Sequence, residues 1–193
     1  MVRKIITSIM LLIWCQLALA LDENSINTVN VNDFWNNYIS YVDEPIDSIT
    51  GKKVDVWQTP KETIGLKTGD CEDYAIIKYF DLINSGVDSK KLYLAWVIIN
   101  EDLIIKNNFK SHIVLVYEND NKSWVLDNYS KEIIELKNRT DFLRIVAKLT
   151  NHGNKIYFKC GDKIIKKWEL LLANYNSNML DVENLKKMYR IQK

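Results

Sequence analysis

A chain of 193 residues, 47% of them apolar and 26% charged, is long enough to bury one hydrophobic core and too apolar to stay unstructured. Only 2 prolines and 6 glycines are present, which leaves no low-complexity linker and predicts one domain. The formal charge is +1, with no basic patch, and this argues against nucleic acid as a partner.

Residues 1–20 have the pattern of a secretory signal peptide. Arg3 and Lys4 form a basic region, residues 5–17 are mostly apolar, and Ala18-Leu19-Ala20 is typical of a cleavage site. The apolar segment is shorter than the ~20 residues that a membrane-spanning helix needs, so cleavage is expected rather than retention as an anchor. Removing the two basic residues changes the formal charge from +1 to −1.

Two cysteines, Cys71 and Cys160, remain in the expected mature domain, residues 21–193. In an exported and oxidising compartment they could pair with each other. A domain with an ample core does not need one disulfide to fold, so a free Cys71 is the preferred interpretation. The sequence assigns no role to Cys160.

The first part of the mature domain is predicted to be helical. Residues 21–31 are polar and predict a loose leader, whereas apolar side chains recur at helical spacing over residues 31–42, with Asn30 or Asn32 as the N-cap. Residues 43–55 contain a proline and a glycine and predict a loop.

Two helix starts follow this loop. The segment Thr59-Pro60-Lys61-Glu62 has the residues of a capping box and predicts a short helix. A Gly turn then leads into a strongly amphipathic helix that begins at Cys71 and ends before Gly86.

The segment after Gly86 predicts strands, at residues 92–99, 111–117, 123–127, 133–136 and 155–160. Loop or turn chemistry separates the first three, at residues 101–110 and 118–122. Helices are predicted at residues 141–149, 164–175 and 181–191. Helices followed by an antiparallel sheet and then by helices indicate an α+β domain.

Cys71 is the first candidate for chemistry. A thiol at a helix N-terminus lies at the positive end of the helix dipole, which favours the nucleophilic thiolate. Three carboxylates, Asp70, Glu72 and Asp73, adjoin it, and like charge raises a thiol pKa. Either Cys71 is not a nucleophile, or a cation neutralises these acids.

The chain has 2 histidines, one of which lies near a possible partner. His112 starts one strand of the predicted hairpin and Asp127 ends the next, so these two ends come side by side. Asp127 could therefore orient the imidazole as a base for a cysteine nucleophile. Taken alone, His112 could equally be a partly buried strand residue. His152 lies in a predicted surface turn.

Four segments together resemble the bacterial transglutaminase-like cysteine proteinases, the LapG-type periplasmic adhesin proteases. They are GDCEDYAI-x-KYF at residues 69–80, HIVL at 112–115, LDN at 126–128 and W-x-x-P at 57–60. The similarity spans about residues 30–175. Ile113 and Tyr129 depart from the family pattern, which commonly has Met and Leu there, and neither is expected to touch the chemistry.

The resemblance implies a papain- or transglutaminase-like fold, in which the nucleophile helix packs on the antiparallel sheet. It implies an endopeptidase with Cys71 as nucleophile, His112 as base and then acid, and Asp127 as the orienting group. It also implies bound Ca²⁺, for which Asp70, Glu72 and Asp73 are the candidate ligands. Carboxylate oxygens suit calcium, and no His or Cys cluster suits zinc. The backbone N–H of Cys71, the Trp57 indole and the Gln58 amide are candidate oxyanion donors.

The same resemblance implies a periplasmic location and two protein partners. The substrate would be a large surface adhesin, cut near its N-terminus to control biofilm attachment. An inner-membrane receptor for cyclic dimeric guanosine monophosphate would sequester the protease. Two other functions remain open: a transglutaminase, which shares the thioester step, and an inactive binding module of the same fold.

Overall fold

The structure, a computed structural model, describes residues 23–100, 109–158 and 162–177. The helices are α2 (Glu23–Tyr38), α3 (Pro60–Leu66), α4 (Cys71–Asn84) and α5 (Asp162–Ser177), with 3-10 turns η1 (Ser89–Lys91) and η2 (Leu136–Asn138). The strands are β1 (Ser40–Tyr41), β2 (Thr68–Gly69), β3 (Leu92–Asn100), β4 (Phe109–Asn119), β5 (Lys122–Leu126), β6 (Ile134–Glu135), β7 (Phe142–Leu149) and β8 (Lys155–Ile156). The expected signal peptide, Cys160 and the expected helix at 181–191 lie outside the described residues.

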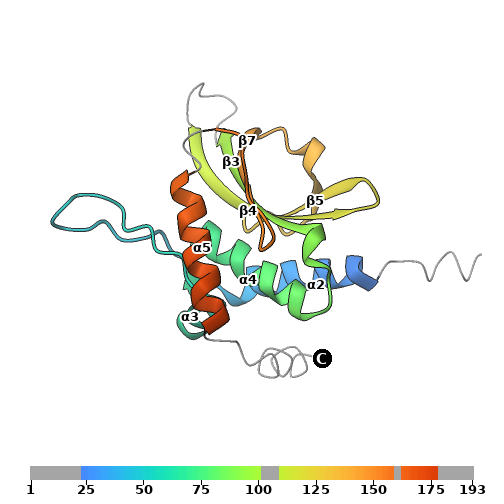
Figure 1. Ribbon diagram of the computed structural model, residues 1–193, viewed down its shortest axis with the longest axis horizontal. Helices are drawn as coiled ribbons and strands as arrows, with labels where there is room; N and C mark the ends of the chain where they lie inside the picture. The colour runs from blue at the N-terminus through green and yellow to red at the C-terminus, as the bar shows by residue number, and fades with distance from the viewer. Residues whose placement is uncertain (1–22, 101–108, 159–161, 178–193) are drawn as a thin grey trace, which may run out of the picture.

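Six strands form one antiparallel sheet in the order β6-β5-β4-β3-β7-β8. Helices α2 and α4 lie together on one side of it, and α5 crosses near the start of α4 (Figure 1). The predicted α+β class is therefore confirmed, with the helix that begins at Cys71 packed against β4 and β3. The predicted β4–β5 hairpin is also confirmed, and Asp120 and Asn121 at its turn have positive φ.

Apolar residues of α4 make the centre of the core. Ile76, Tyr79 and Leu82 have no exposed surface, because α2, α5 and the sheet surround this helix. Trp35 of α2 donates its indole N–H to Asp81 of α4 at 2.7 Å, so the two helices are joined by a buried hydrogen bond as well as by packing. Trp168 anchors α5 on the same cluster and is also fully buried. Helix α4 is thus packed against other elements on three sides.

Two sequence predictions are wrong. Residues 141–149 were expected to form a helix but form β7, which pairs along β3; the β-branched Ile145 and Val146 fit a paired strand, and pairing outweighs local helix propensity. Helix α2 begins at Glu23, within the segment expected to be a loose leader, so Asn30 and Asn32 lie inside the helix and neither is its N-cap. Thr28, in the part of α2 that was not predicted, is a buried polar residue, so an apolar pattern could not reveal this part.

The predicted loop at residues 43–55 extends from the body of the molecule beside α3 (Figure 1). A single bridge between Ile46 and Lys53 holds its two sides together, and Gly51 has φ of 64°. Within the part of the chain that the structure describes, no helix has both the length and the apolar character needed to cross a membrane.

Candidate active site

Cys71 is the first residue of α4, and the turn before it is tightly built. The backbone N–H of Asp70 donates to the Asp73 carboxylate at 3.2 Å, which closes the first turn of the helix. Gly69 is needed for this approach, because a Cβ at that position would lie 2.6 Å from the Cβ of Asp73. The sequence thus places a free, partly buried thiol at a fixed helix N-terminus.

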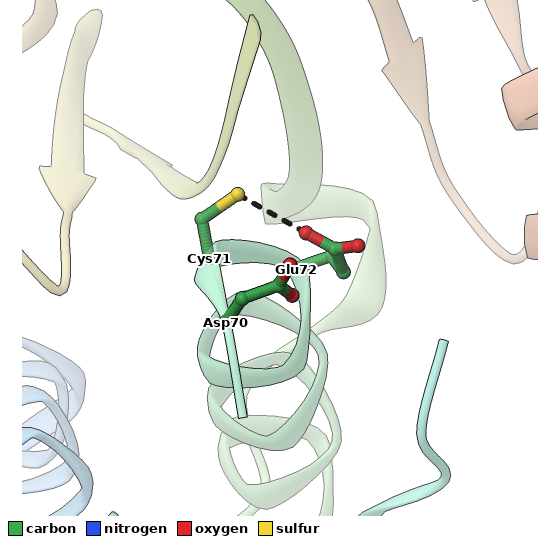
Figure 2. A group of neighbouring side chains, drawn as sticks. All are labelled: Asp70, Cys71 and Glu72. Carbon is green, nitrogen blue, oxygen red and sulfur yellow. Dashed lines mark hydrogen bonds between the residues drawn. The ribbon is translucent and has the colours of Figure 1, made fainter. Parts of the chain in front are cut away.

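The thiol of Cys71 donates to Oε2 of Glu72 at 3.1 Å (Figure 2). Burial raises the pKa of this thiol well above its usual range, and the Glu72 carboxylate raises it further. The backbone N–H of Ile113 acts in the opposite direction and lowers it. Burial and the neighbouring acids therefore favour the thiol form, which is the problem that the sequence presented.

His112 and Asp127 meet in the interior, each with 1% of its surface exposed. The imidazole Nε2 lies 2.9 Å from Oδ1 of Asp127, so this pair comes together as the hairpin register predicted. Arg139 donates to the other carboxylate oxygen at 2.8 Å. Burial alone would raise the pKa of Asp127, but the hydrogen bond from His112 and the charges of His112 and Arg139 lower it well below its ordinary value.

The thiol of Cys71 comes from α4, and the imidazole of His112 comes from β4. Because the Cys71 sulfur interacts with the backbone N–H of Ile113, it lies at the residue that follows His112 on β4. Nε2 of the imidazole already faces Asp127, which leaves Nδ1 as the ring nitrogen for the thiol. Cys71 and Ile113 line an open cleft of about 570 Å³, where a peptide could reach the sulfur.

Tyr129 contacts the histidine directly, so the expectation that this position does not touch the chemistry is wrong. Its ring stacks on the imidazole of His112 with centroids 4.6 Å apart and planes within 1°. Its backbone N–H donates to Oδ1 of Asp127 at 3.1 Å. A flat side chain on one face of the imidazole restricts rotation of the ring and shields the bond to Asp127 from water.

Asp70 and Glu72 form the acidic group predicted beside the thiol. Oxygen atoms of the two carboxylates and the Cys71 sulfur all lie within 4.8 Å of one another (Figure 2). Burial raises the pKa of Glu72 to about 9, with a further contribution from its hydrogen bond to Asp70. Oδ1 of Asp70 is buried and has no hydrogen-bond partner among the residues that the structure describes. Unsatisfied carboxylate oxygen at this point is what a hard cation such as Ca²⁺ would bind.

Asp73 lies differently from the other two acids. Its carboxylate accepts the backbone N–H of Gln58 at 2.9 Å and that of Asp70 at 3.2 Å. It is not part of either group of potential metal ligands among the described residues. In the structure, the Asp73 carboxylate closes the first turn of α4.

Two further acids reach the same place from the loop at residues 43–55. Carboxylate oxygens of Glu44, Asp55 and Glu72 lie within 4.8 Å of one another. Sequence reasoning missed Glu44 and Asp55, because each is an ordinary loop acid with no motif around it. It also missed Arg139, whose distance in sequence from Asp127 gives no sign of their contact.

The remaining candidates separate clearly. Trp57 is half-buried and lines the cleft that holds Cys71, whereas Gln58 lines a neighbouring cavity beside Asp73. The Trp57 indole is therefore better placed as an oxyanion donor than the Gln58 side chain. His152 is exposed and binds Asn151 within its own turn, so it takes no part in the site.

Comparison with known proteins now decides the family. The family model described as "bacterial transglutaminase-like cysteine proteinase BTLCP" matches residues 16–158, about three quarters of the chain. The chain belongs to this family. A bacterial transglutaminase-like cysteine proteinase needs a thiol nucleophile, and Cys71 is the free cysteine among the described residues.

Solved structures agree with this assignment. LapG from Legionella pneumophila is 28% identical, with a TM-score of 0.60 over 78% of this chain and 76% of that one. Its calcium-bound form has a TM-score of 0.59 at 28% identity, over 78% and 79% of the two chains. Its EGTA-treated form has a TM-score of 0.62 at 28% identity, over 81% and 82%. No curated protein matches the chain. The fold of this bacterial transglutaminase-like cysteine proteinase is thus that of LapG.

Proposed function

We propose that this chain is a calcium-dependent cysteine endopeptidase in which Cys71 is the nucleophile, His112 the base and then the acid, and Asp127 the orienting group. One observation carries the proposal: His112 is paired with Asp127, and the backbone N–H of the next residue, Ile113, interacts with the free thiol of Cys71 at a helix N-terminus. An imidazole held by a carboxylate has one nitrogen committed and the other available to exchange a proton.

The residues would act in sequence on a peptide in the cleft. Nδ1 of His112 takes the thiol proton, and the Cys71 sulfur attacks the carbonyl carbon while the backbone N–H of Cys71 binds the developing oxyanion. The imidazolium returns its proton to the leaving amine, which leaves a thioester on Cys71. His112 then deprotonates water, whose attack on the thioester releases the acid product and restores the thiol. Asp127 stabilises the imidazolium at each stage.

Asp70 and Glu72 are the proposed calcium ligands, with Asp73 the less supported third member because backbone N–H groups already occupy its oxygens. The orphaned Oδ1 of Asp70 and the all-oxygen donor set fit this ion. When bound, Ca²⁺ would offset the negative charge of the ionised Asp70 and Glu72 carboxylates, which would otherwise raise the pKa of the Cys71 thiol. Support also comes from LapG, for which a calcium-bound structure exists.

Calcium binding is expected to release about one proton at pH 7.5. The pKa of Glu72 is raised to about 9 by burial and by Asp70, so this carboxyl is protonated at that pH and must ionise to bind the metal. Affinity should then fall by about tenfold for each pH unit below 9. Isothermal titration calorimetry in buffers of different ionisation enthalpy measures both quantities.

The same raised pKa fixes the sign of the contribution that Glu72 makes to the pH dependence of folding. The folded state holds the Glu72 proton more tightly than the unfolded chain, so without calcium the contribution of Glu72 to the unfolding free energy falls as pH rises from ~4.5 to 9. Glu72→Gln should remove both this slope and the released proton. Glu132→Gln, at an exposed loop position, is the matched control. Calcium binding to wild type with no proton release would contradict the assignment.

The proposed setting is the periplasm, reached through a signal peptide at residues 1–20 that is cleaved to leave residues 21–193. The proposed substrate is a large surface adhesin, cut near its N-terminus so that cell attachment is reduced. The proposed regulator is an inner-membrane receptor for cyclic dimeric guanosine monophosphate. Both partners rest on the resemblance of the motifs around Cys71, His112 and Asp127 to the adhesin proteases.

The size of the products tests the function. The protein is incubated with N-terminal fragments of large exported adhesins, with calcium or with EGTA, and the mixture is separated by mass. An endopeptidase cuts the fragment into two shorter chains, and the amount of these products is greater in calcium than in EGTA. A transglutaminase yields heavier species, because an amine rather than water resolves the thioester. Uncut fragments in both conditions, with no heavier species, would favour the binding module.

A further inference from the structure

Lys78 is a completely buried lysine that the proposed mechanism does not use. It lies on α4, two turns beyond Cys71 and on the same side of the helix. Its Nζ donates to Oδ1 of Asn32 on α2 at 2.8 Å and to the backbone carbonyl oxygen of Asp127 at 3.2 Å. A buried amine in the core is thus bonded to the main chain of the residue that orients the histidine.

Stability does not explain this lysine. Burial disfavours its charged form and lowers the pKa of Lys78 to about 7, even though the Asp127 charge acts to raise it. Burying such a group costs free energy, and apolar residues of similar volume often replace buried polar pairs with no loss of stability. A residue that opposes folding but is bonded to the site has a functional explanation instead.

The contacts divide Asp127 into two ends. Arg139 and His112 bind its carboxylate, whereas its carbonyl oxygen accepts hydrogen bonds from Lys78 and, at 2.8 Å, from Nδ2 of Asn36. The donors to the carbonyl come from two helices, α4 and α2. Asp127 itself lies just beyond β5, where the strand no longer fixes its position.

Helix α4 therefore carries both the sulfur of Cys71 and the amine of Lys78 that is bonded to Asp127. Helix α4 presents Cys71 at its first residue and Lys78 seven residues later, which is ~10.5 Å along the axis. Bonding through Lys78 ties the Asp127 main chain to the helix that carries the sulfur. Neutral or charged, the amine keeps at least two N–H donors, enough for both acceptors.

We propose that Lys78, together with Asn32, is a positioning residue: it holds the Asp127 main chain so that the carboxylate stays aligned with His112. The proposal rests on the Cys71–His112–Asp127 assignment made above. Without this contact, Asp127 and the imidazole shift relative to the thiol, and misplacement of a catalytic group by about 1 Å costs on the order of 10²-fold in rate.

The test is the double variant Lys78→Met with Asn32→Leu, which removes donor and acceptor together so that neither is left buried alone. Lys78→Met alone is the second variant, and Lys163→Met, on the exposed side of α5, is the matched control.

Three readouts are taken: the midpoint of thermal unfolding, the rate of Cys71 alkylation by iodoacetamide in a Cys160→Ser background, and ¹H–¹⁵N imidazole NMR. With only 2 histidines, each ring can be assigned, and exposed His152 is an internal reference.

We expect the double variant to unfold cooperatively, with a midpoint close to wild type, while the alkylation rate falls by about tenfold or more. The His112 ring signals should move and the signals of His152 should not. A folded variant with unchanged alkylation and unchanged His112 signals would overturn the positioning role. Loss of cooperative unfolding in both variants would also overturn it, by assigning the pair to folding.

The two proposals fail in different ways. If, in the presence of calcium, wild-type NMR shows no hydrogen-bonded His112 ring and Cys71 is not alkylated faster than an ordinary thiol, the proposed function itself is wrong. If wild type shows both features and the variants retain them, only the role of Lys78 is wrong.

Discussion

Cys71→Ser is expected to lower kcat/KM for cleavage of an adhesin fragment by about 10⁴-fold or more, because an alcohol in the same place is a far weaker nucleophile than an activated thiol. The surroundings of Cys71 suit sulfur: the residue begins α4, and the Ile113 backbone N–H favours its ionised form. A serine hydroxyl has a much higher pKa and gains too little from these contacts. Steady-state cleavage in calcium measures the loss.

Alkylation measures the reactivity of the Cys71 thiol independently of cleavage. Iodoacetamide should modify Cys71 in wild type faster with calcium than with EGTA, by about tenfold for each unit by which the metal lowers the thiol pKa. Cys160→Ser should cleave the fragment as wild type does, since this residue has no assigned role. If Cys71→Ser supports release of the adhesin as well as wild type, the protein is a binding module and not a protease.

Residues that act through local pattern were predictable from the sequence. The helix that begins at Cys71 has a glycine before it, acids in its first turn and apolar residues at helical spacing, and each signal depends only on nearby residues. The hairpin fixes its own register through its turn, which is why His112 and Asp127 could be paired without coordinates. Short-range rules were sufficient for this part of the site.

Contacts set by tertiary packing were not predictable in this way. Residues 141–149 carry no strong period, and only pairing with β3 makes them a strand. Arg139 reaches Asp127 because the chain after β6 turns back across the end of β5. Glu44 and Asp55 reach Glu72 because the two ends of the loop at residues 43–55 lie beside the start of α4. The stacking of Tyr129 on His112 likewise depends on tertiary packing. Nothing near these residues in sequence specifies their partners.

Because Arg139 also binds Asp127, the side chain at this position must accept hydrogen bonds from more donors than the histidine alone. Oδ1 of Asp127 accepts from His112 and from the backbone N–H of Tyr129, while Oδ2 accepts from Arg139 at 2.8 Å. Each of these three neighbours is a donor. An asparagine offers one accepting oxygen and one donating NH₂ group, so one side of the site must meet donor with donor.

Asp127→Asn is therefore expected to lower kcat/KM by about 10³- to 10⁴-fold, although cysteine proteases of the papain type use asparagine as the orienting residue. The Arg139 guanidinium cannot lose its proton, so it donates to the amide oxygen of the asparagine, and the NH₂ group then faces His112 and selects the wrong imidazole tautomer. Arg139→Met should restore part of the activity of Asp127→Asn, because the amide is then free to present its oxygen to His112. Measured singly, Arg139→Met should cost much less than Asp127→Asn, since Asp127 retains His112 and the Tyr129 N–H. Cleavage rates for the two single variants and the double variant form a complete mutant cycle. Equal losses in Asp127→Asn with and without Arg139 would refute the proposed division of the carboxylate between its donors.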